Sequence, residues 1–260
     1  SERAEAAATS SAGRVTLVSG NEAADADSIV TAIVFAYLLH QDSVPGAVFP
    51  IIQCLREDIQ LRNETVLLLR RCGVDDVSKL LFVEDAIAQK LLLRTSNLVL
   101  VDHNATTGPL SALEAQVSEI IDHHEDLGRH AHVQGDKRLI AFEHGAATAA
   151  SACTLVAERY LAHPQGESLL QGDSGSVARV LLGVILIDSV NLDPAAKKVT
   201  PRDVAIAAKL TAIAPMPSPE ELFKLLSDAK FDAECWEGLS LAQCLRYDFK
   251  SFEAAGYTVG

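Results

Sequence analysis

The chain has 260 residues, of which 48% are hydrophobic, and a formal net charge of −13 at pH 7. This length suits one large α/β domain with an appended segment, and no apolar run is long enough to cross a bilayer, so we expect no membrane partner. The acidic balance lacks the basic footprint of a nucleic-acid-binding protein, which excludes that partner class. A polyanionic substrate stays open, because bound divalent cations invert the local field.

Residues 1–13 are small and polar and have no hydrophobic segment of the kind found in secretory signals, so we expect them to form a mobile tail. The five cysteines are scattered along the chain and show no zinc-knuckle or redox spacing. Reduced thiols of this kind indicate a reducing compartment, and we therefore expect a cytoplasmic protein.

Strands and helices alternate in the first half of the chain. The predicted strands cover residues 14–20, 47–53, 80–83, 97–101, 117–121 and 138–142. The predicted helices between them cover residues 28–39, 61–71 and 84–93. This alternation predicts an α/β fold: a mostly parallel sheet of about five strands with helices on both faces. Such sheets bind ligands beyond the carboxyl ends of their strands.

The second half of the chain is predicted to be helical. The expected helices cover residues 146–162, 176–187, 200–213 and 219–228. Proline follows Thr200 and Ser218, which is typical of a helix start. Residues 214–219 are rich in proline and mark a joint. We therefore expect a tail (1–13), a main domain (14–213), and a linker with the start of a second domain (214–260) that is too short to hold its own core.

Four short acidic clusters each follow an apolar run. They lie at residues 21–28, 102–104, 122–124 and 188–189. Carboxylates and imidazoles are ligands suited to Mg²⁺ and Mn²⁺, and elements that end in one region could gather them into a two-metal site for phosphoryl chemistry. A single acidic cluster would more simply be a loop or helix cap, but four clusters, two of them with histidine, favour a metal site.

The carboxylates of these clusters suggest separate roles. Asp25 and Asp27 alternate along a strand-to-helix turn, so each could face a different metal. Asp102 and Asp188 each end an apolar run, where a lone carboxylate is costly to bury, and either could bridge two metals. A helix cap for Asp27 and a backbone-bonded helix end for Asp188 remain alternatives.

The histidines and the nearby basic residues are less clear from the residues alone. His123 and His124 point to opposite sides of an extended segment, so one would bind metal and the other would meet substrate or solvent. Lys197, Lys198 and Arg202 could neutralise a polyanion, or they could be part of a solvated face. Residues 145–151 open the expected helix 146–162, whose free N–H groups could hold phosphate.

In their order and spacing, the motifs resemble those of the DHH phosphoesterase superfamily. The resemblance rests on Gly20-Asn-Glu-Ala-Ala-Asp25, Asp102-His-Asn104, Asp122-His-His124, Asp188-Ser-Val-Asn191 and Lys198-Val-Thr-Pro-Arg-Asp203, and it spans residues 14–260. Within the superfamily, the chain is similar to the exopolyphosphatase and prune branch and to the family II inorganic pyrophosphatases.

The resemblance implies a role for each motif residue. The implied metal ligands are Asn21, Asp25, Asp27, Asp102, His123 and Asp188, with Asp102 and Asp188 shared between two ions. The implied catalytic residues are His124, Asp102 and Asp188, and the implied substrate contacts are His103, His124, Lys198 and Arg202. The pyrophosphatases carry a metal-binding histidine in place of Asn21, and prune-type relatives carry arginine in place of His124, so His124 favours the exopolyphosphatase reading.

The activity implied is release of terminal orthophosphate from inorganic polyphosphate by a water that two Mn²⁺ or Mg²⁺ ions activate. Pyrophosphate hydrolysis and prune-type cleavage of short polyphosphates or cyclic nucleotides are the alternatives, and a binding protein without catalysis is the alternative from another class. The family's second domain, of the DHHA2 type, closes over the phosphate chain. Residues 214–260 match only its start, so we expect a weakened substrate clamp.

Overall fold

The computed structural model describes residues 14–214, 218–237, 239–247, 252–254 and 257–259. Its centre is a five-stranded sheet in the order β2-β1-β3-β4-β5, and each neighbouring pair is parallel. The strands are β1 (Val15–Ser19), β2 (Ala47–Ile51), β3 (Thr95–Val101), β4 (Val117–Asp122) and β5 (Arg138–Ile140). The expected α/β fold with a parallel sheet of about five strands is confirmed.

Successive side chains of a strand point to opposite faces, and both faces of this sheet are covered. In β3, Val99 and Val101 pack in the larger core, while Leu98 and Leu100 pack in the smaller one. Strands buried on both faces read as continuous apolar runs, which is why the sequence shows no polar alternation here.

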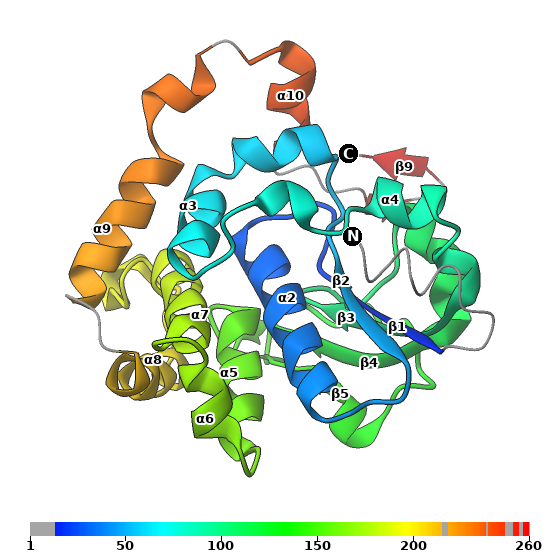
Figure 1. Cartoon of the computed structure of the whole chain (residues 1–260), viewed down its shortest axis with the longest axis horizontal. Coiled ribbons are helices and arrows are strands. Elements are labelled where there is room, and N and C mark those ends of the chain that lie inside the picture. The colour runs from blue at the N-terminus through cyan, green and yellow to red at the C-terminus, as the bar shows by residue number, and fades with distance from the viewer. Residues whose placement is uncertain (1–13, 215–217, 238, 248–251, 255–256, 260) are drawn as a thin grey trace.

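The helices are, in chain order, α2 (Ala26–Gln41), α3 (Asn63–Arg71), α4 (Val83–Ala88), α5 (Ala152–Ala162), α6 (Gly166–Gln171), α7 (Ser176–Asp188), α8 (Pro201–Ile213), α9 (Pro219–Lys230) and α10 (Leu241–Arg246). Helices α2, α5 and α7 pack together beside the sheet (Figure 1). The smaller core on the other face includes α4 and the 3-10 segment Gly108–Gln116. No helix in the described part of the chain is long and apolar enough to span a membrane.

Helix α9 packs against α3 and α7, and its Leu222 and Leu226 are buried in the larger core. Gly183 in α7 makes this approach possible: a Cβ there would lie 2.8 Å from Leu68 and 3.1 Å from Leu226. Helix α9 therefore contributes directly to the main body.

Three predicted elements differ from the structure. The helix expected over 146–162 begins at Ala152, because residues 146–147 pair as β7 with β6 (Phe142–Glu143) around a turn in which His144 and Gly145 have positive φ. The strand expected over 80–83 is reduced to one bridge between Ile52 and Phe82. The helix expected over 84–93 ends at Ala88 and is followed by the 3-10 turn Leu92–Arg94.

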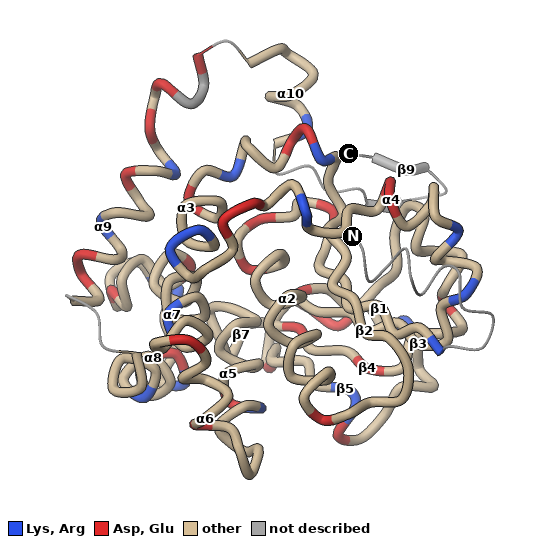
Figure 2. The backbone as a smooth tube through the Cα atoms, viewed as in Figure 1, with Lys and Arg blue, Asp and Glu red and all other residues tan. Residues whose placement is uncertain are grey.

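Charged residues are distributed along the whole tube, and no single element carries them (Figure 2). The acidic motifs, however, share one location, because three of them lie at the carboxyl ends of β1, β3 and β4. These strands are neighbours at the centre of the sheet, so their ends meet at one edge.

A candidate metal centre at the carboxyl edge of the sheet

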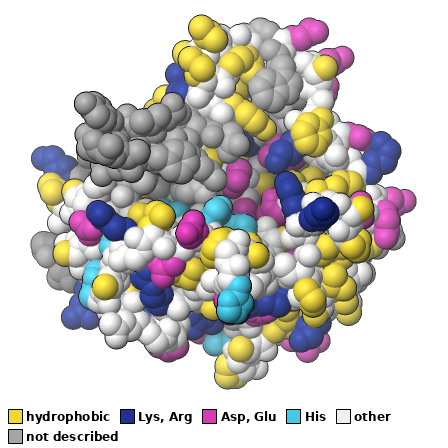
Figure 3. Space-filling model, turned by 180° about the vertical axis from the view of Figure 1, so that it is seen from behind, with side chains coloured by type: hydrophobic (Ala, Val, Ile, Leu, Met, Phe, Trp, Pro, Cys, Tyr) yellow, Lys and Arg dark blue, Asp and Glu magenta, His cyan; other side chains and the backbone are white. Residues whose placement is uncertain are grey.

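A cleft of about 730 Å³ lies at this edge. The predicted site residues that line it are Asp25, Asp27, Asp102, His123, His124, Asp188 and Lys198. On the face opposite to that of Figure 1, histidine and acidic side chains lie next to one another near the middle of the molecule (Figure 3). Predicted site residues as far apart in the sequence as Asp25 and Lys198, which are separated by 173 positions, thus converge on one cleft.

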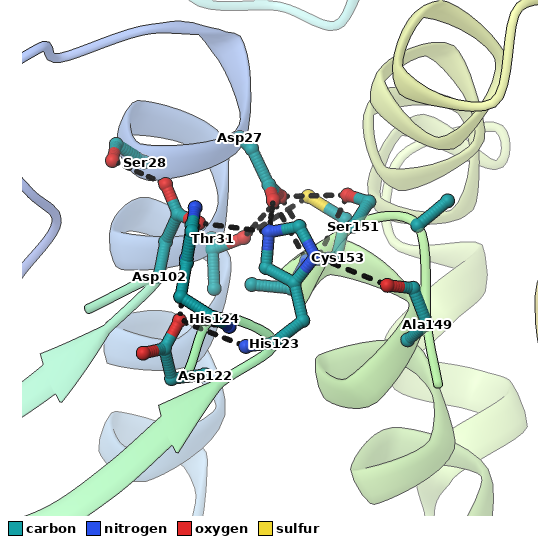
Figure 4. Close-up of polar contacts among 12 residues, drawn as sticks. Asp27, Ser28, Thr31, Asp102, Asp122, His123, His124, Ala149, Ser151 and Cys153 are labelled. Carbon is teal, nitrogen blue, oxygen red and sulfur yellow. Dashed lines mark hydrogen bonds and ion pairs between the residues drawn. The ribbon is translucent and has the colours of Figure 1, made fainter. Parts of the chain in front are cut away.

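His123 is held in one orientation by the main chain. Its Nδ1 lies 3.0 Å from the carbonyl oxygen of Ala149, and because a carbonyl only accepts, Nδ1 carries the proton of that bond. Its Nε2 lies 3.2 Å from Asp102 Oδ1 and 3.5 Å from Asp27 Oδ2 (Figure 4). A histidine fixed through Nδ1 presents Nε2 as a metal ligand, which is the arrangement that metal sites use.

The segment that holds His123 is itself anchored from α8. Asp203, a fully buried residue, accepts hydrogen bonds from the Ala150 amide at 3.0 Å and from the Thr154 hydroxyl at 2.6 Å. It also caps its own helix through Thr200. The main chain around Ala149 is therefore fixed by the start of α8.

Asp27 is bound by the start of helix α5. Its Oδ1 accepts from Ser151 Oγ at 2.7 Å and from the Cys153 amide at 3.0 Å, and its Oδ2 accepts from the Ala152 amide at 2.7 Å. A helix amino terminus favours an anion. Asp27 therefore engages the amides of Ala152 and Cys153, and the expectation that N–H groups near 145–151 hold phosphate stays a prediction.

Asp102 follows β3 directly and has φ of 62°, the left-handed region that non-glycine residues seldom adopt. Its amide donates to the Ile121 carbonyl at 2.9 Å. Its Oδ2 accepts from Ser28 Oγ at 2.6 Å and from Asn21 Nδ2 at 2.8 Å, while Oδ1 remains toward His123. These contacts aim one carboxylate oxygen into the cleft.

Asn21 lies behind Asp102. Its Nδ2 donates to the Asp102 carboxylate, and its Oδ1 accepts from the Ala23 amide at 2.9 Å. Both ends of the amide are thus engaged, and Asn21 borders a neighbouring cavity of about 330 Å³ instead of the main cleft. This arrangement favours a role for Asn21 in positioning Asp102 over the predicted role as a metal ligand.

His124 is paired with Asp122. Its Nδ1 lies 2.8 Å from Asp122 Oδ1, and Asp122 also accepts the amides of His123 and His124. Burial would raise the pKa of Asp122, but the hydrogen bond and charge of His124 and the bond from Asn104 lower it to about 2. The hydrogen bond to Asp122 in turn raises the pKa of His124, which is half-exposed beside the cleft.

Asp25 and Asp188 complete the acidic lining. Asp25 is the N-cap of α2 and accepts from the Ser28 amide at 3.0 Å. Asp188 is the last residue of α7, and its Oδ2 is inaccessible to water yet has no hydrogen-bond partner within the described structure. A buried carboxylate oxygen without a partner is costly, and a cation would offset that cost.

Burial and mutual charge shift the pKa values of several side chains in this acidic cluster. Burial and the charge of Asp27 raise the pKa of Asp102. Burial, with Asp27 and Asp25 nearby, raises the pKa of Asp188 as well. Burial would lower the pKa of His123, but its hydrogen bond to Asp102 and the charge of Asp27 raise it. Two divalent cations would relieve this repulsion, so the residues fit a divalent metal pair.

Three of these residues have side-chain atoms close enough to one another to hold a metal ion. One ligand atom each from Asp102, His123 and His124 lies within 4.8 Å of the others. His124 therefore lies close to the candidate metal ligands as well as in the place of the substrate contact that the resemblance implies.

The remaining predicted substrate contacts are divided between different places. Lys198 lines the cleft. His103 borders the neighbouring cavity, with Nδ1 donating to the Val101 carbonyl at 2.9 Å. Arg202 pairs with Glu158 at 2.9 Å and does not line the cleft.

Two further lysines line the cleft. Lys197 adjoins Lys198, and the sequence already suggested it, with Lys198 and Arg202, as a group that could neutralise a polyanion. Lys230 reaches the cleft from the end of α9, and no local motif indicates this. Its place depends on the packing of α9 against α3 and α7.

The fold and this side-chain cluster define an α/β domain with a group of residues that fits a divalent metal centre. Residues 15–183 match the DHH family, N-terminal domain, so the chain belongs to the DHH family. The resemblance to the exopolyphosphatase and prune branch is confirmed by curated relatives. Exopolyphosphatase PRUNE1 of Bos taurus is 33% identical over 250 residues, and that of Homo sapiens is 32% identical; each match covers 94% of this chain and 51% of the relative.

A solved structure shares the fold. The crystal structure of a Methanococcus jannaschii protein assigned to the family II inorganic pyrophosphatases superposes with a TM-score of 0.61 at 25% identity, covering 94% of this chain and 69% of the other. The chain spans about half the length of the curated relatives it matches, 51% in both mammalian proteins.

Proposed function

We propose that this chain is a metal-dependent phosphoanhydride hydrolase that releases terminal orthophosphate from inorganic polyphosphate. The observation that carries the proposal is the convergence on one cleft of His123 Nε2, the Asp102 carboxylate at 3.2 Å and the Asp27 carboxylate at 3.5 Å. The relatives named exopolyphosphatase and the family membership support the same chemistry.

The proposed metal ligands are Asp25, Asp27, Asp102, His123 and Asp188, and the proposed ions are Mn²⁺ or Mg²⁺. When bound, a divalent pair supplies an activated water and neutralises charge on the phosphoryl oxygens. The protein itself contributes ligands whose orientation is fixed by the main chain and by the start of α5.

His124 is the proposed proton donor and phosphoryl contact. Asp122, whose pKa is lowered to about 2, stays charged and holds a proton on His124 Nδ1. A positively charged imidazole beside the cleft stabilises the negative charge that develops during phosphoryl transfer. Lys197, Lys198 and Lys230 line the same cleft and would neutralise further phosphates of a chain.

Pyrophosphate is the second candidate substrate, because the Methanococcus jannaschii relative with the shared fold is assigned to the family II pyrophosphatases. The lysines around the cleft favour a longer polyanion, since each additional phosphate brings charge that a pyrophosphate-sized ligand does not offer.

The test is orthophosphate release by the purified chain with Mn²⁺ or Mg²⁺, using pyrophosphate, tripolyphosphate and long-chain polyphosphate at equal phosphate concentration. We expect metal-dependent release and a higher kcat/KM on the two longer substrates. Faster turnover of pyrophosphate would select the second candidate. Calorimetric Mn²⁺ binding without any phosphate release would contradict both and identify a binding protein.

A further inference from the structure

A buried arginine lies beneath the turn that carries the first acidic motif. Arg62 is 3% exposed and is the residue at the amino-terminal boundary of α3. Its Nε donates to the Ala24 carbonyl at 2.5 Å and to the Ala23 carbonyl at 3.2 Å, and Nη2 also donates to the Ala23 carbonyl. One guanidinium group therefore binds the two consecutive carbonyls that immediately precede Asp25.

The turn that Arg62 binds is conformationally strained. Ala24 has φ of 47°, in the left-handed region that an alanine seldom adopts. Such a conformation persists only when surrounding contacts hold it. The next residue, Asp25, caps α2, and Asp27 lies in the first turn of that helix. The direction in which both carboxylates enter the cleft thus depends on this turn.

The residue type suits this task. The planar fork of arginine donates several hydrogen bonds in fixed directions, which a lysine ammonium on a flexible stem does not reproduce. Among the described residues, no carboxylate lies within ion-pair distance of Arg62. Its guanidinium donates instead to the main-chain carbonyls of Ala23, Ala24 and Asp58. A small cavity of about 110 Å³ lies between this guanidinium and Asp25.

A second arginine, far along the chain, reaches the same place. Arg246 at the end of α10 binds the buried Asp58 through Nε at 2.6 Å and Nη2 at 2.9 Å. The Asp58 carbonyl accepts from Arg62 Nη1 at 3.1 Å. The ring of Tyr247 lies 5.9 Å from the guanidinium carbon of Arg62. Asp58 therefore connects α10 to the arginine that holds the metal-binding turn.

We infer that Arg62 is a positioning residue that holds Asp25 and Asp27 in their metal-binding arrangement, and that α10 supports it through Arg246 and Asp58. The inference rests on the proposed role of Asp25 and Asp27 as metal ligands. It adds a link from α10 to the metal cleft, although no described side chain after residue 238 lines the cleft itself.

The first test compares Arg62→Lys with Arg56→Lys. Arg56 is a matched control, because it also donates to a carbonyl, that of Ser78, and lies over an aromatic ring, that of Phe82, but it does not touch the turn. We expect Arg62→Lys to weaken calorimetric Mn²⁺ affinity about tenfold and to speed amide hydrogen exchange in residues 21–28 of the metal-free chain. Arg56→Lys should change neither.

The second test removes the strain that Arg62 offsets. Glycine adopts positive φ without steric cost, so Ala24→Gly should restore most of the Mn²⁺ affinity lost in Arg62→Lys while changing the parent less than twofold. An arginine that merely stabilises the fold would not be rescued in this way, because Ala24→Gly removes a buried methyl group and adds no contact.

The third test addresses α10. Arg246→Ala should weaken Mn²⁺ binding severalfold, and the control Lys224→Ala, which breaks the exposed pair with Asp228, should not. Unchanged Mn²⁺ affinity and unchanged exchange in Arg62→Lys, or a deficit that Ala24→Gly leaves in place, would overturn the inference. Failure of the parent chain to bind Mn²⁺ would instead overturn the proposed function. In that case the amide hydrogen exchange of residues 21–28 still tests the inference, because an Arg62→Lys rate equal to that of the metal-free parent would contradict it.

Discussion

The carboxylates around the cleft differ in how far the protein itself satisfies them. Asp27 accepts bonds from Thr31, Ser151, Ala152 and Cys153, whereas Asp188 Oδ2 has no partner within the described residues. The first arrangement fixes the orientation of a carboxylate, and the second leaves a buried oxygen that a cation would stabilise. Rigid and unsatisfied ligands together are what a preorganised metal site requires.

Asp102 offers the most direct test at this scale. Asp102→Asn should reduce Mn²⁺-dependent phosphate release by roughly hundredfold or more, because it removes a charge beside both His123 and Asp27. Phosphate release is measured with circular dichroism as the control for folding. Asp193→Asn, at an exposed cap outside the cleft, is the matched variant and should retain full activity. Activity of Asp102→Asn within a fewfold of the parent would rule out the assignment.

The same residue predicts how stability responds to pH without metal. Burial and the charge of Asp27 raise the pKa of Asp102 from 3.8 to about 7, so across this window the folded chain binds more protons than the unfolded chain. Stability must then fall as the pH rises through that window. We expect the Tm of the EDTA-treated chain to fall between about pH 5.5 and pH 8.

Two comparisons sharpen this pH prediction. Asp102→Asn should flatten the dependence, because an amide does not titrate, and saturating Mn²⁺ should remove it, because metal binding favours the deprotonated carboxylates. A Tm that rises with pH in the metal-free parent would contradict the raised pKa values of Asp102 and Asp188.

At the scale of elements, two helices present opposite ends to the cleft. Helix α5 points its amino terminus at Asp27, and this favours the charged carboxylate. Helix α7 ends at Asp188, so that carboxylate lies at the negative end of its own helix, where a charge is disfavoured. The two ends thus surround one carboxylate with hydrogen-bond donors and leave the other at a helix end where a cation would stabilise its charge.

Ser151 tests the contribution of the α5 terminus. It caps α5 and also donates to Asp27, so Ser151→Ala should cost about 1–2 kcal/mol of stability and also weaken Mn²⁺ binding. Ser218→Ala removes a comparable cap from α9, which has no contact with Asp27, and should affect stability alone. Urea unfolding and Mn²⁺ titration of both variants decide the matter, and equal Mn²⁺ affinities would remove Ser151 from the site.

At the scale of the whole molecule, the cleft carries a group of lysines although the net charge of the chain is negative. The chain carries a net −13, yet Lys197, Lys198 and Lys230 gather at the cleft. Helix α9 packs on α3 and α7 and brings Lys230 to a site built mainly by residues before 190. An otherwise acidic molecule thus offers a polyanion a local place of attraction.

Salt should therefore weaken substrate binding, because exposed charges are screened beyond a distance of about 8–10 Å at physiological ionic strength. We expect Lys198→Ala to raise the KM for tripolyphosphate severalfold and to reduce its salt dependence, with little change in kcat. Lys209→Ala, an exposed lysine of α8 outside the cleft, is the control. Equal KM values for the two variants across a salt series would exclude Lys198 from substrate binding.

Local signals in the sequence were sufficient for the sheet and for most of the acidic residues and histidines that line the cleft. Apolar runs of strand length predicted the central strands, and acidic residues directly after them had to meet at one edge, since parallel strands end on the same side. The prediction failed for the start of α5, because the pairing of residues 146–147 with 142–143 depends on a turn with two positive φ values.

By itself, the sequence determined the fold class, the edge of the sheet where the cleft lies, and the residue types able to bind metal. Only the tertiary structure decided which partner holds each ligand: the start of α5 for Asp27, Asn21 and Ser28 for Asp102, and Arg62 for the turn before Asp25. These partners lie up to 126 positions apart, as Asp27 and Cys153 do. Hydrogen bonds between distant segments leave no periodic pattern in the sequence, because each depends on how the elements pack.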